Sequence, residues 1–360
     1  MMNKKHIMAL LLAASALSAN PVQAGSCYES CDPCEMDSCF GGFDIGADFI
    51  YWNMCLDDLN YATAYTTAFP IAAPGPTTVF DESGSIQNLS SKWEPGFRVY
   101  AAKEGVFYDW DLLASYTWIK HTKSGSTTVA DGGLLQPTLI NPNAFLAPAG
   151  DLGVAGVSAS MEVKYQSFDV LFAADYSFKQ CHSFKPFFGV TGLFFDQTLT
   201  SAWDKSDAEE ISSGVTSWTD DYSGYGLKLG TQYAFTICDG FSMYANAEGM
   251  ITVGSHDSTF AQDKDIILLG GEPNLATLSI KEQETIFVPG YHIGVGFQYE
   301  SCMCDIEYGI HIGYEFLVWH NIPNQRRNFS SDLDNFSLVS AGSTSTAGYH
   351  GLTVGLNLSF

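Results

Sequence analysis

The feature that most constrains the fold is a strict alternation of apolar and polar side chains over long segments. In residues 304–318, one face would carry Ile306, Tyr308, Ile310, Ile312, Tyr314, Phe316 and Val318, and the other Asp305, Glu307, Gly309, His311, Gly313 and Glu315. A period of two indicates a β-strand with one apolar and one polar face. Soluble strands usually have about five or six residues, whereas a tilted strand that crosses a membrane needs about 9–11. The segment is therefore typical of a membrane-spanning strand.

The same alternation recurs along the chain, and the links between the segments have a regularity of their own. The other candidate strands are residues 43–54, 93–103, 107–119, 161–178, 186–199, 225–237, 241–253, 287–299 and 350–360. Long links (55–92, 120–160, 200–224, 254–286 and 319–349) alternate with short ones (104–106, 179–185, 238–240 and 300–303). Outer-membrane barrels have this order because their periplasmic turns are short and their outer loops are long. A β-sandwich is the alternative, but it gives no reason for the order.

The sequence thus predicts an all-β fold, a transmembrane antiparallel up-and-down β-barrel with at least ten strands. The long links contain further strand-like pieces at residues 61–67 and 276–280, so any number from ten to sixteen strands fits the pattern. Pro95 and Pro289 each lack a backbone donor, and we expect them near strand ends or bulges.

Residues 1–24 are typical of a secretory signal peptide. Lys4 and Lys5 precede an apolar stretch at 7–17, and Val22-Gln23-Ala24 forms a small-x-small cleavage site. No later apolar run approaches the roughly 18–20 residues of a membrane helix. The expected organisation is a signal peptide at 1–24, a cysteine-rich periplasmic segment at 25–42 and an outer-membrane barrel at 43–360.

The chain is strongly acidic, with 16 Lys and Arg against 40 Asp and Glu and a net charge of −24. This charge argues against a nucleic-acid partner, since such a protein needs cations to neutralise phosphates. A hydrophobic content of 46% argues against a disordered acidic chain. No metal or cofactor motif is found, and we expect no cofactor.

Several short aromatic motifs stand in an order that resembles a known family. They are Phe49-Ile50-Tyr51-Trp52, Lys92-Trp93-Glu94-Pro95-Gly96-Phe97, Trp110-Asp111-Leu112, Tyr116-Thr117-Trp118, and Gly313-Tyr314-Glu315-Phe316 followed by Trp319. The chain resembles the Legionella-type major outer membrane proteins, which include the MOMP-like porins of chlamydia-related bacteria. The resemblance spans most of the mature chain and implies a pore-forming outer-membrane barrel without catalytic residues.

If the apolar faces meet lipid, the opposite faces line the lumen. These faces offer the carboxylates Asp44, Asp48, Glu94, Asp109, Asp111, Asp169, Asp175, Glu248, Asp305, Glu307 and Glu315, the cations Arg98 and Lys228, and the histidines His292 and His311. A lumen with one dominant sign attracts counter-ions, which predicts a modest preference for cations. In the alternative interpretation, several carboxylates pair with Arg98, Lys228 or loop bases, or lie at the rims.

The cysteines gather on the side predicted to be periplasmic. Cys27, Cys31, Cys34 and Cys39 precede the first strand, and Cys181, Cys238, Cys302 and Cys304 lie in or beside short turns, whereas Cys55 would face outward. An oxidising compartment favours disulfides over a zinc site. Bridges within the chain, and cross-links to other envelope proteins or to a second copy, both remain open.

The interpretation that fits best is an outer-membrane porin for passive diffusion of small solutes and ions. The alternative is a structural or adhesin barrel in a disulfide-linked envelope, because a narrow barrel of about eight to ten strands can be filled by side chains. An enzyme is not expected; Asp57-Asp58 and His256-Asp257 could be read as a protease pair, but nothing fixes their geometry. Expected partners are outer-membrane lipid and the barrel-assembly machinery, with Phe360 as the assembly signal.

Overall fold

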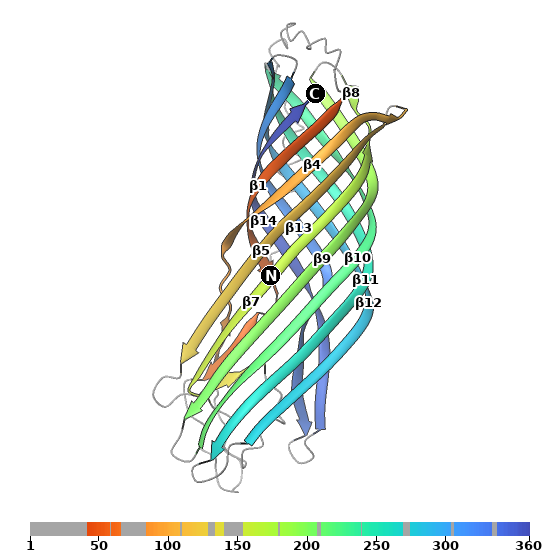
Figure 1. Ribbon diagram of the computed structural model, residues 1–360. Helices are drawn as coiled ribbons and strands as arrows, with labels where there is room; N and C mark the ends of the chain where they lie inside the picture. The colour runs from red at the N-terminus through yellow and green to blue at the C-terminus, as the bar shows by residue number, and fades with distance from the viewer. Residues whose placement is uncertain are drawn as a thin grey trace.

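Ten long antiparallel strands form a closed barrel in the computed structural model of the chain (Figure 1). The structure describes residues 42–57, 59–65, 84–108, 110–128, 134–139, 154–178, 181–206, 210–238, 240–268, 274–303, 306–332 and 337–360. The barrel strands are β1 (Phe43–Leu56), β4 (Trp93–Phe107), β5 (Trp110–Thr128), β7 (Gly156–Ala173), β9 (His182–Ser206), β10 (Glu210–Cys238), β11 (Phe241–Leu268), β12 (Asn274–Met303), β13 (Ile306–Asp332) and β14 (Ser337–Ser359).

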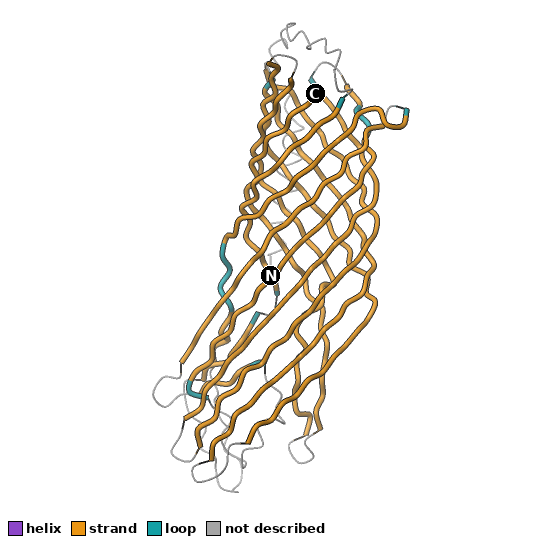
Figure 2. The backbone as a smooth tube through the Cα atoms, viewed as in Figure 1, coloured by secondary structure: helices purple, strands orange, loops and turns teal. Residues whose placement is uncertain are grey.

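Each barrel strand pairs with its neighbours in the chain, and β1 pairs with β14 to close the ring. Phe360 exchanges backbone hydrogen bonds with Phe43, at N···O distances of 3.0 and 3.2 Å. The described chain consists of strands and short connections (Figure 2). Within it, no helix is long and apolar enough to cross a membrane. The predicted all-β barrel is confirmed, and its strand number is the lowest of the predicted range.

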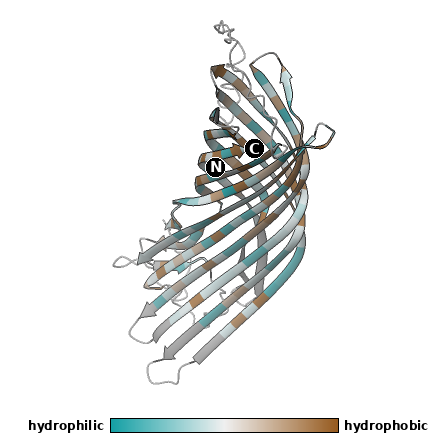
Figure 3. Cartoon of the chain, turned by 45° about the horizontal axis from the view of Figure 1, so that its top comes forward, coloured by the Kyte–Doolittle hydropathy of each residue, from teal (hydrophilic) through white to brown (hydrophobic). Residues whose placement is uncertain are grey.

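Apolar side chains cover the outer surface of the barrel in what we call the apolar belt. Its exposed members are Phe43, Ile45, Phe49, Tyr51, Trp93, Phe97, Val99, Phe172, Phe188, Val190, Tyr225, Leu227, Leu229, Tyr233, Ile251, Val253, Phe287, Tyr291, Ile293, Val295, Phe297, Ile310, Ile312, Phe316, Leu352, Val354 and Leu356. Apolar and polar colours alternate along these strands in Figure 3. An apolar surface of this extent is unfavourable in water, and it matches the lipid-facing band of a membrane barrel.

The strands from β9 to β14 continue well beyond the belt, where we expected loops. The predicted long links 200–224, 254–286 and 319–349 are wrong in this respect, because each is mostly strand. Asp221, for example, pairs with Asp257 beyond the belt. Both faces of the sheet carry polar residues there, so the sequence loses its alternation while the backbone ladder continues.

Predicted boundaries at the opposite end also differ. The turn expected at 300–303 is strand, because β12 runs to Met303. The turn expected at 104–106 is strand, because β4 runs to Phe107 through an irregularity that follows Lys103, and the positive φ of 54° falls on Tyr108. The segment 161–178 is not one strand: β7 ends at Ala173, and β8 (Tyr176–Phe178) pairs with the start of β9.

A small second sheet packs against the inside of the barrel. It contains β3 (Gly84–Asn88), β2 (Asn60–Tyr65) and β6 (Leu134–Pro137) in that order. Tyr61 and Leu135 of this sheet are buried in one cluster with Trp52, Tyr165 and Tyr349 of the barrel wall. The signal peptide and nearly all of the predicted segment 25–42 lie outside the described residues.

Candidate functional site: the barrel interior

A cavity of about 530 Å³ occupies the interior at the level of the belt. Its lining comes from strands all around the ring, because every second side chain of a barrel strand points inward. The predicted residues Asp44, Asp48, Arg98, Asp169, Asp175, Lys228, Glu248, His292, His311 and Glu315 lie in this lining. Sequence periodicity had therefore identified the face on which they lie.

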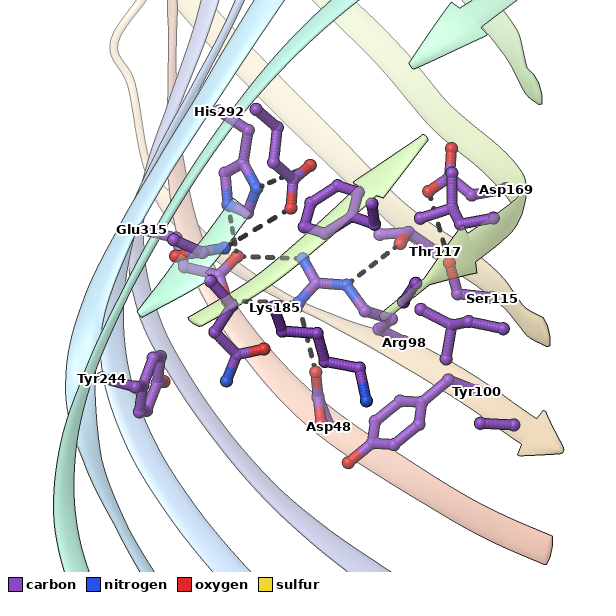
Figure 4. Close-up of a pocket in the computed structure, with 18 of the residues that line it drawn as sticks. Asp48, Arg98, Tyr100, Ser115, Thr117, Asp169, Lys185, Tyr244, His292 and Glu315 are labelled. Carbon is purple, nitrogen blue, oxygen red and sulfur yellow. Dashed lines mark hydrogen bonds and ion pairs between the residues drawn. The ribbon is translucent and has the colours of Figure 1, made fainter. Parts of the chain in front are cut away.

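Arg98 of β4 makes the central contacts of the cavity (Figure 4). Its guanidinium forms a fork on Glu315 of β13, with Nη1–Oε1 and Nη2–Oε2 distances of 3.1 and 2.9 Å. Nη1 also donates to Asp48 Oδ2 of β1 at 3.2 Å, and Nε donates to Thr117 at 3.3 Å. Such two-point contacts between arginine and carboxylate are among the stronger hydrogen bonds in proteins.

A second set of contacts continues from Glu315 to the opposite wall. His292 of β12 lies between two carboxylates, 3.1 Å from Glu315 Oε2 and 3.3 Å from Glu248 Oε2. Lys228 of β10 then joins Glu248 of β11 at 2.6 Å to Asp169 of β7 at 3.1 Å. We call the residues Asp48, Arg98, Asp169, Lys228, Glu248, His292 and Glu315 the lumen network.

The lumen network brings both signs of charge together across the barrel. Arg98 and Lys228 each contact two carboxylates, and His311 lies 3.2 Å from Asp48. This arrangement is the paired alternative for these residues, while carboxylates still outnumber Arg98, Lys185 and Lys228 in the lining as a whole. The sequence could not show the contact between Arg98 and Glu315, which are 217 residues apart, whereas Asp48 with Arg98 and Glu248 with His292 are register partners on neighbouring strands.

Lys185 is a third interior cation that the sequence analysis missed. Its ammonium lies 2.8 Å from Asp175 and 3.3 Å from Asp111. Lys185 belongs to the predicted short link 179–185, but β9 already begins at His182. Of the other predicted carboxylates, Glu94 and Glu307 are half-buried on β4 and β13 and do not line the cavity, and Asp109 and Asp305 lie outside the described residues.

Several inward-facing polar atoms have no protein partner among the described residues. Asp44 Oδ1, Asp169 Oδ1, Thr191 Oγ1 and Thr353 Oγ1 belong to this group. Buried polar atoms are nearly always hydrogen-bonded, to protein or to ordered water. Water is therefore expected beside these atoms.

Aromatic rings narrow the interior next to the network. The Tyr349 ring centroid lies 6.1 Å from that of Trp52 and 5.3 Å from that of Tyr165. His121, on β5 beyond Trp118 and the edge of the belt, lies 5.4 Å from the Tyr349 ring. Burial lowers the pKa of His121 to about 4, and burial likewise lowers the pKa of the neighbouring Lys123 to about 8.

Within the described residues, His256 of the hypothetical protease pair has a different acidic partner from the one next to it in the sequence. His256 contacts Asp220 of β10, whereas Asp257 lies on the outer face of β11. Burial opposes protonation of His256, but Asp220 raises its pKa above the usual value. Asp57 is exposed, and Asp58 lies outside the described residues. No group of His, Cys, Asp and Glu in the described part of the chain suits a metal ion.

Few of the cysteine predictions can be compared with the structure. Cys181 is disulfide-bonded, whereas Cys55 and Cys238 are exposed free thiols. Cys238 therefore forms no bridge within the chain, since its side chain points to solvent at the end of β10. Cys27, Cys31, Cys34, Cys39, Cys302 and Cys304 lie outside the described side chains, so the predicted disulfide framework stays a prediction.

A closed barrel with an apolar outer belt and a charged interior defines a transmembrane β-barrel protein. The family model described as "Legionella pneumophila major outer membrane protein precursor" matches residues 33–360. The chain belongs to this family, and it is a protein of the bacterial outer membrane.

No protein with a curated description matches the chain in sequence. Among solved structures, it is similar to the outer membrane protease OmpT from Escherichia coli, with 7% identity over 89% of this chain and 97% of that one and a TM-score of 0.43. It is also similar to a Pseudomonas aeruginosa FadL homologue, with 9% identity over 89% and 90% of the chains and a TM-score of 0.23. The Pseudomonas putida toluene transporter TodX gives 8% identity over 88% of each chain and a TM-score of 0.24.

Proposed function

We propose that the protein is a narrow outer-membrane pore that passes ions and small solutes by diffusion. The observation that carries the proposal is the cavity of about 530 Å³, lined by charged side chains. A barrel that served only as a scaffold would gain stability from an apolar interior, because ionic groups are costly to bury. The lumen network retains those groups in the interior of the described barrel.

The bore is expected to be small. Wide aqueous channels belong to barrels of about 16 strands, whereas about eight strands leave an interior that side chains can fill. The rings of Trp52, Tyr165 and Tyr349 occupy part of the path. Ions and small polar solutes would pass the lumen network in a partly dehydrated state, at a low rate.

Planar-bilayer recording of the refolded protein tests this proposal. We expect discrete current steps of low conductance, and a reversal potential in a salt gradient that indicates a modest cation preference. Glu248→Gln should change the step size, while Lys120→Met, on the outer wall, should leave it unchanged. Bilayers that stay silent with correctly folded protein would overturn the pore, and a clear anion preference would overturn the expected selectivity.

A structural or adhesive barrel is the second candidate. The observation that favours it is the aromatic cluster around Tyr349, which closes much of the interior. The exposed Cys238 thiol adds a site for a cross-link to another envelope protein. Under this alternative the bilayers remain silent, and non-reducing electrophoresis of envelopes gives disulfide-linked species rather than a purely monomeric band.

A further inference from the structure

Beyond the belt, the barrel wall is open between β12 and β13. Their pairing ends at Gly290 and Trp319, although β12 begins at Asn274 and β13 continues to Asp332. Residues 274–289 of β12 pair with β11 on one side and with no described strand on the other. A strand edge of this kind presents unpaired N–H and C=O groups and can accept a further strand.

The missing strand has turned into the barrel. The β13–β14 register shifts between Trp319 and Ile322, and Asn321 in this bulge has a φ of 60°, which is uncommon for a residue other than glycine. Beyond the bulge, Ile322 is fully buried. The Pro323 carbonyl accepts a hydrogen bond of 2.9 Å from Gln197 Nε2 on β9, a strand that is not a neighbour of β13 in the sheet.

Side chains satisfy the two backbone carbonyls at which β12 and β13 part. Asn321 Nδ2 donates to the Phe287 carbonyl of β12 at 2.8 Å, and Gln197 donates to Pro323. In an antiparallel strand, the N–H and C=O groups of every second residue point to the same side. Phe287 and Thr285 therefore both direct their N–H groups to the unpaired side of β12. Pro289 faces the same side of β12 but has no N–H to donate, and the β12–β13 ladder ends beside it, at Gly290.

The free edge of β12 complements the displaced strand. If the hairpin swings back with its bulge retained, the extra residue in β13 sets Ile322 opposite Val288, Pro323 opposite Phe287, and Asn324 opposite Ile286. The Phe287 N–H can then replace Gln197 as the donor to the Pro323 carbonyl. Two residues further along, this register sets Arg326 opposite Glu284, and opposite charges favour such pairing.

We infer that the outer part of the β13–β14 hairpin has two positions, one inside the barrel and one on the free edge of β12. His320 and Asn321 form the hinge. The inner position narrows the outer mouth, and the position on β12 completes the wall and opens the mouth. The expected effect on conductance rests on the proposed pore, whereas the docking of the hairpin on β12 does not depend on it.

A reversible cross-link tests the second position. In a chain with Cys55→Ser and Cys238→Ser, we combine Ile286→Cys with Asn324→Cys, which lie opposite each other only when the hairpin docks on β12. The matched control combines Thr285→Cys with Asn324→Cys, whose side chains would lie on opposite faces of the sheet. Oxidation should cross-link the first pair at least about tenfold faster than the control, as quantified by peptide mapping. Gln197→Ala, which removes the inner hydrogen bond, should accelerate the reaction further.

The outcomes separate the two proposals. We expect conductance to rise on oxidation of the Ile286→Cys, Asn324→Cys protein and to return on reduction. If the pair cross-links no faster than the control while the unmodified protein conducts, the second hairpin position is excluded and the pore stands. If the pair cross-links but no form conducts, the docking stands and the pore is excluded.

Discussion

Replacing Arg98 with methionine is expected to lower the free energy of unfolding by about 3 kcal/mol or more, which is the usual cost of removing one partner of a buried ion pair. The change leaves Glu315 and Asp48 without the guanidinium that now contacts both. Their side chains are 7% and 3% exposed, so water can replace little of that interaction. Urea unfolding in lipid vesicles, followed by tryptophan fluorescence, measures the effect.

An ion pair on the outer wall supplies the matched control. Lys120 contacts Glu162 at 2.8 Å, but both side chains are 38% exposed. Lys120→Met should therefore cost at most about 1 kcal/mol. Adding Glu315→Gln to Arg98→Met should recover part of the loss, since it removes the uncompensated charge. Equal effects of Arg98→Met and Lys120→Met would contradict the role that we assign to the lumen network.

A charge placed in the apolar belt should be almost as damaging. Leu229 lies on β10 and is 66% exposed, between Tyr225 and Tyr233 of the same face. Leu229→Arg is expected to destabilise the protein in vesicles by about 2–4 kcal/mol if the position lies near the bilayer midplane. The physical reason is that the guanidinium loses its hydration in hydrocarbon. The same unfolding assay reports the change.

Ser223 is the control for this substitution. It faces outward on the same strand, one step beyond Tyr225, where exposed residues become polar. Ser223→Arg should cost only about 0–1 kcal/mol, as at a membrane interface. If both variants lose the same stability, or if Leu229→Arg is neutral, then Leu229 does not face lipid.

The membrane-spanning parts of the fold could be predicted from the sequence because lipid and lumen make opposite demands on neighbouring residues. The alternation in 225–237 and 241–253 therefore located β10 and β11. Beyond the belt the outer face is mostly polar, and the buried face mixes Trp218 and Tyr222 with Thr216 and Asp220. The outward-facing apolar pattern that marks a membrane strand is therefore lost in 210–224. The β13–β14 hairpin was hidden in the same way within 319–349.

The interior could be predicted only in part. The alternation of apolar and polar residues indicated that Arg98, Lys228 and Glu315 face inward, because the side to which a side chain points depends on its own strand alone. Which charges meet depends on the closure of the ring, as in the contact between Arg98 and Glu315, which are 217 residues apart in the chain. The bulge at Asn321 and the inward turn of the hairpin also have no local signal, because they depend on contacts with β9 and β12.

The central claim is that alternate side chains of each barrel strand face hydrocarbon, and one scan tests it most directly. A fluorescent amino acid is placed at each position from 112 to 118 of β5, a stretch without glycine, and the protein is refolded into vesicles that contain nitroxide-labelled lipid. Leu113, Ser115 and Thr117 line the cavity, so we predict strong quenching at the even-numbered positions and little at the odd-numbered ones. Uniform quenching, or none at any position, would contradict the account.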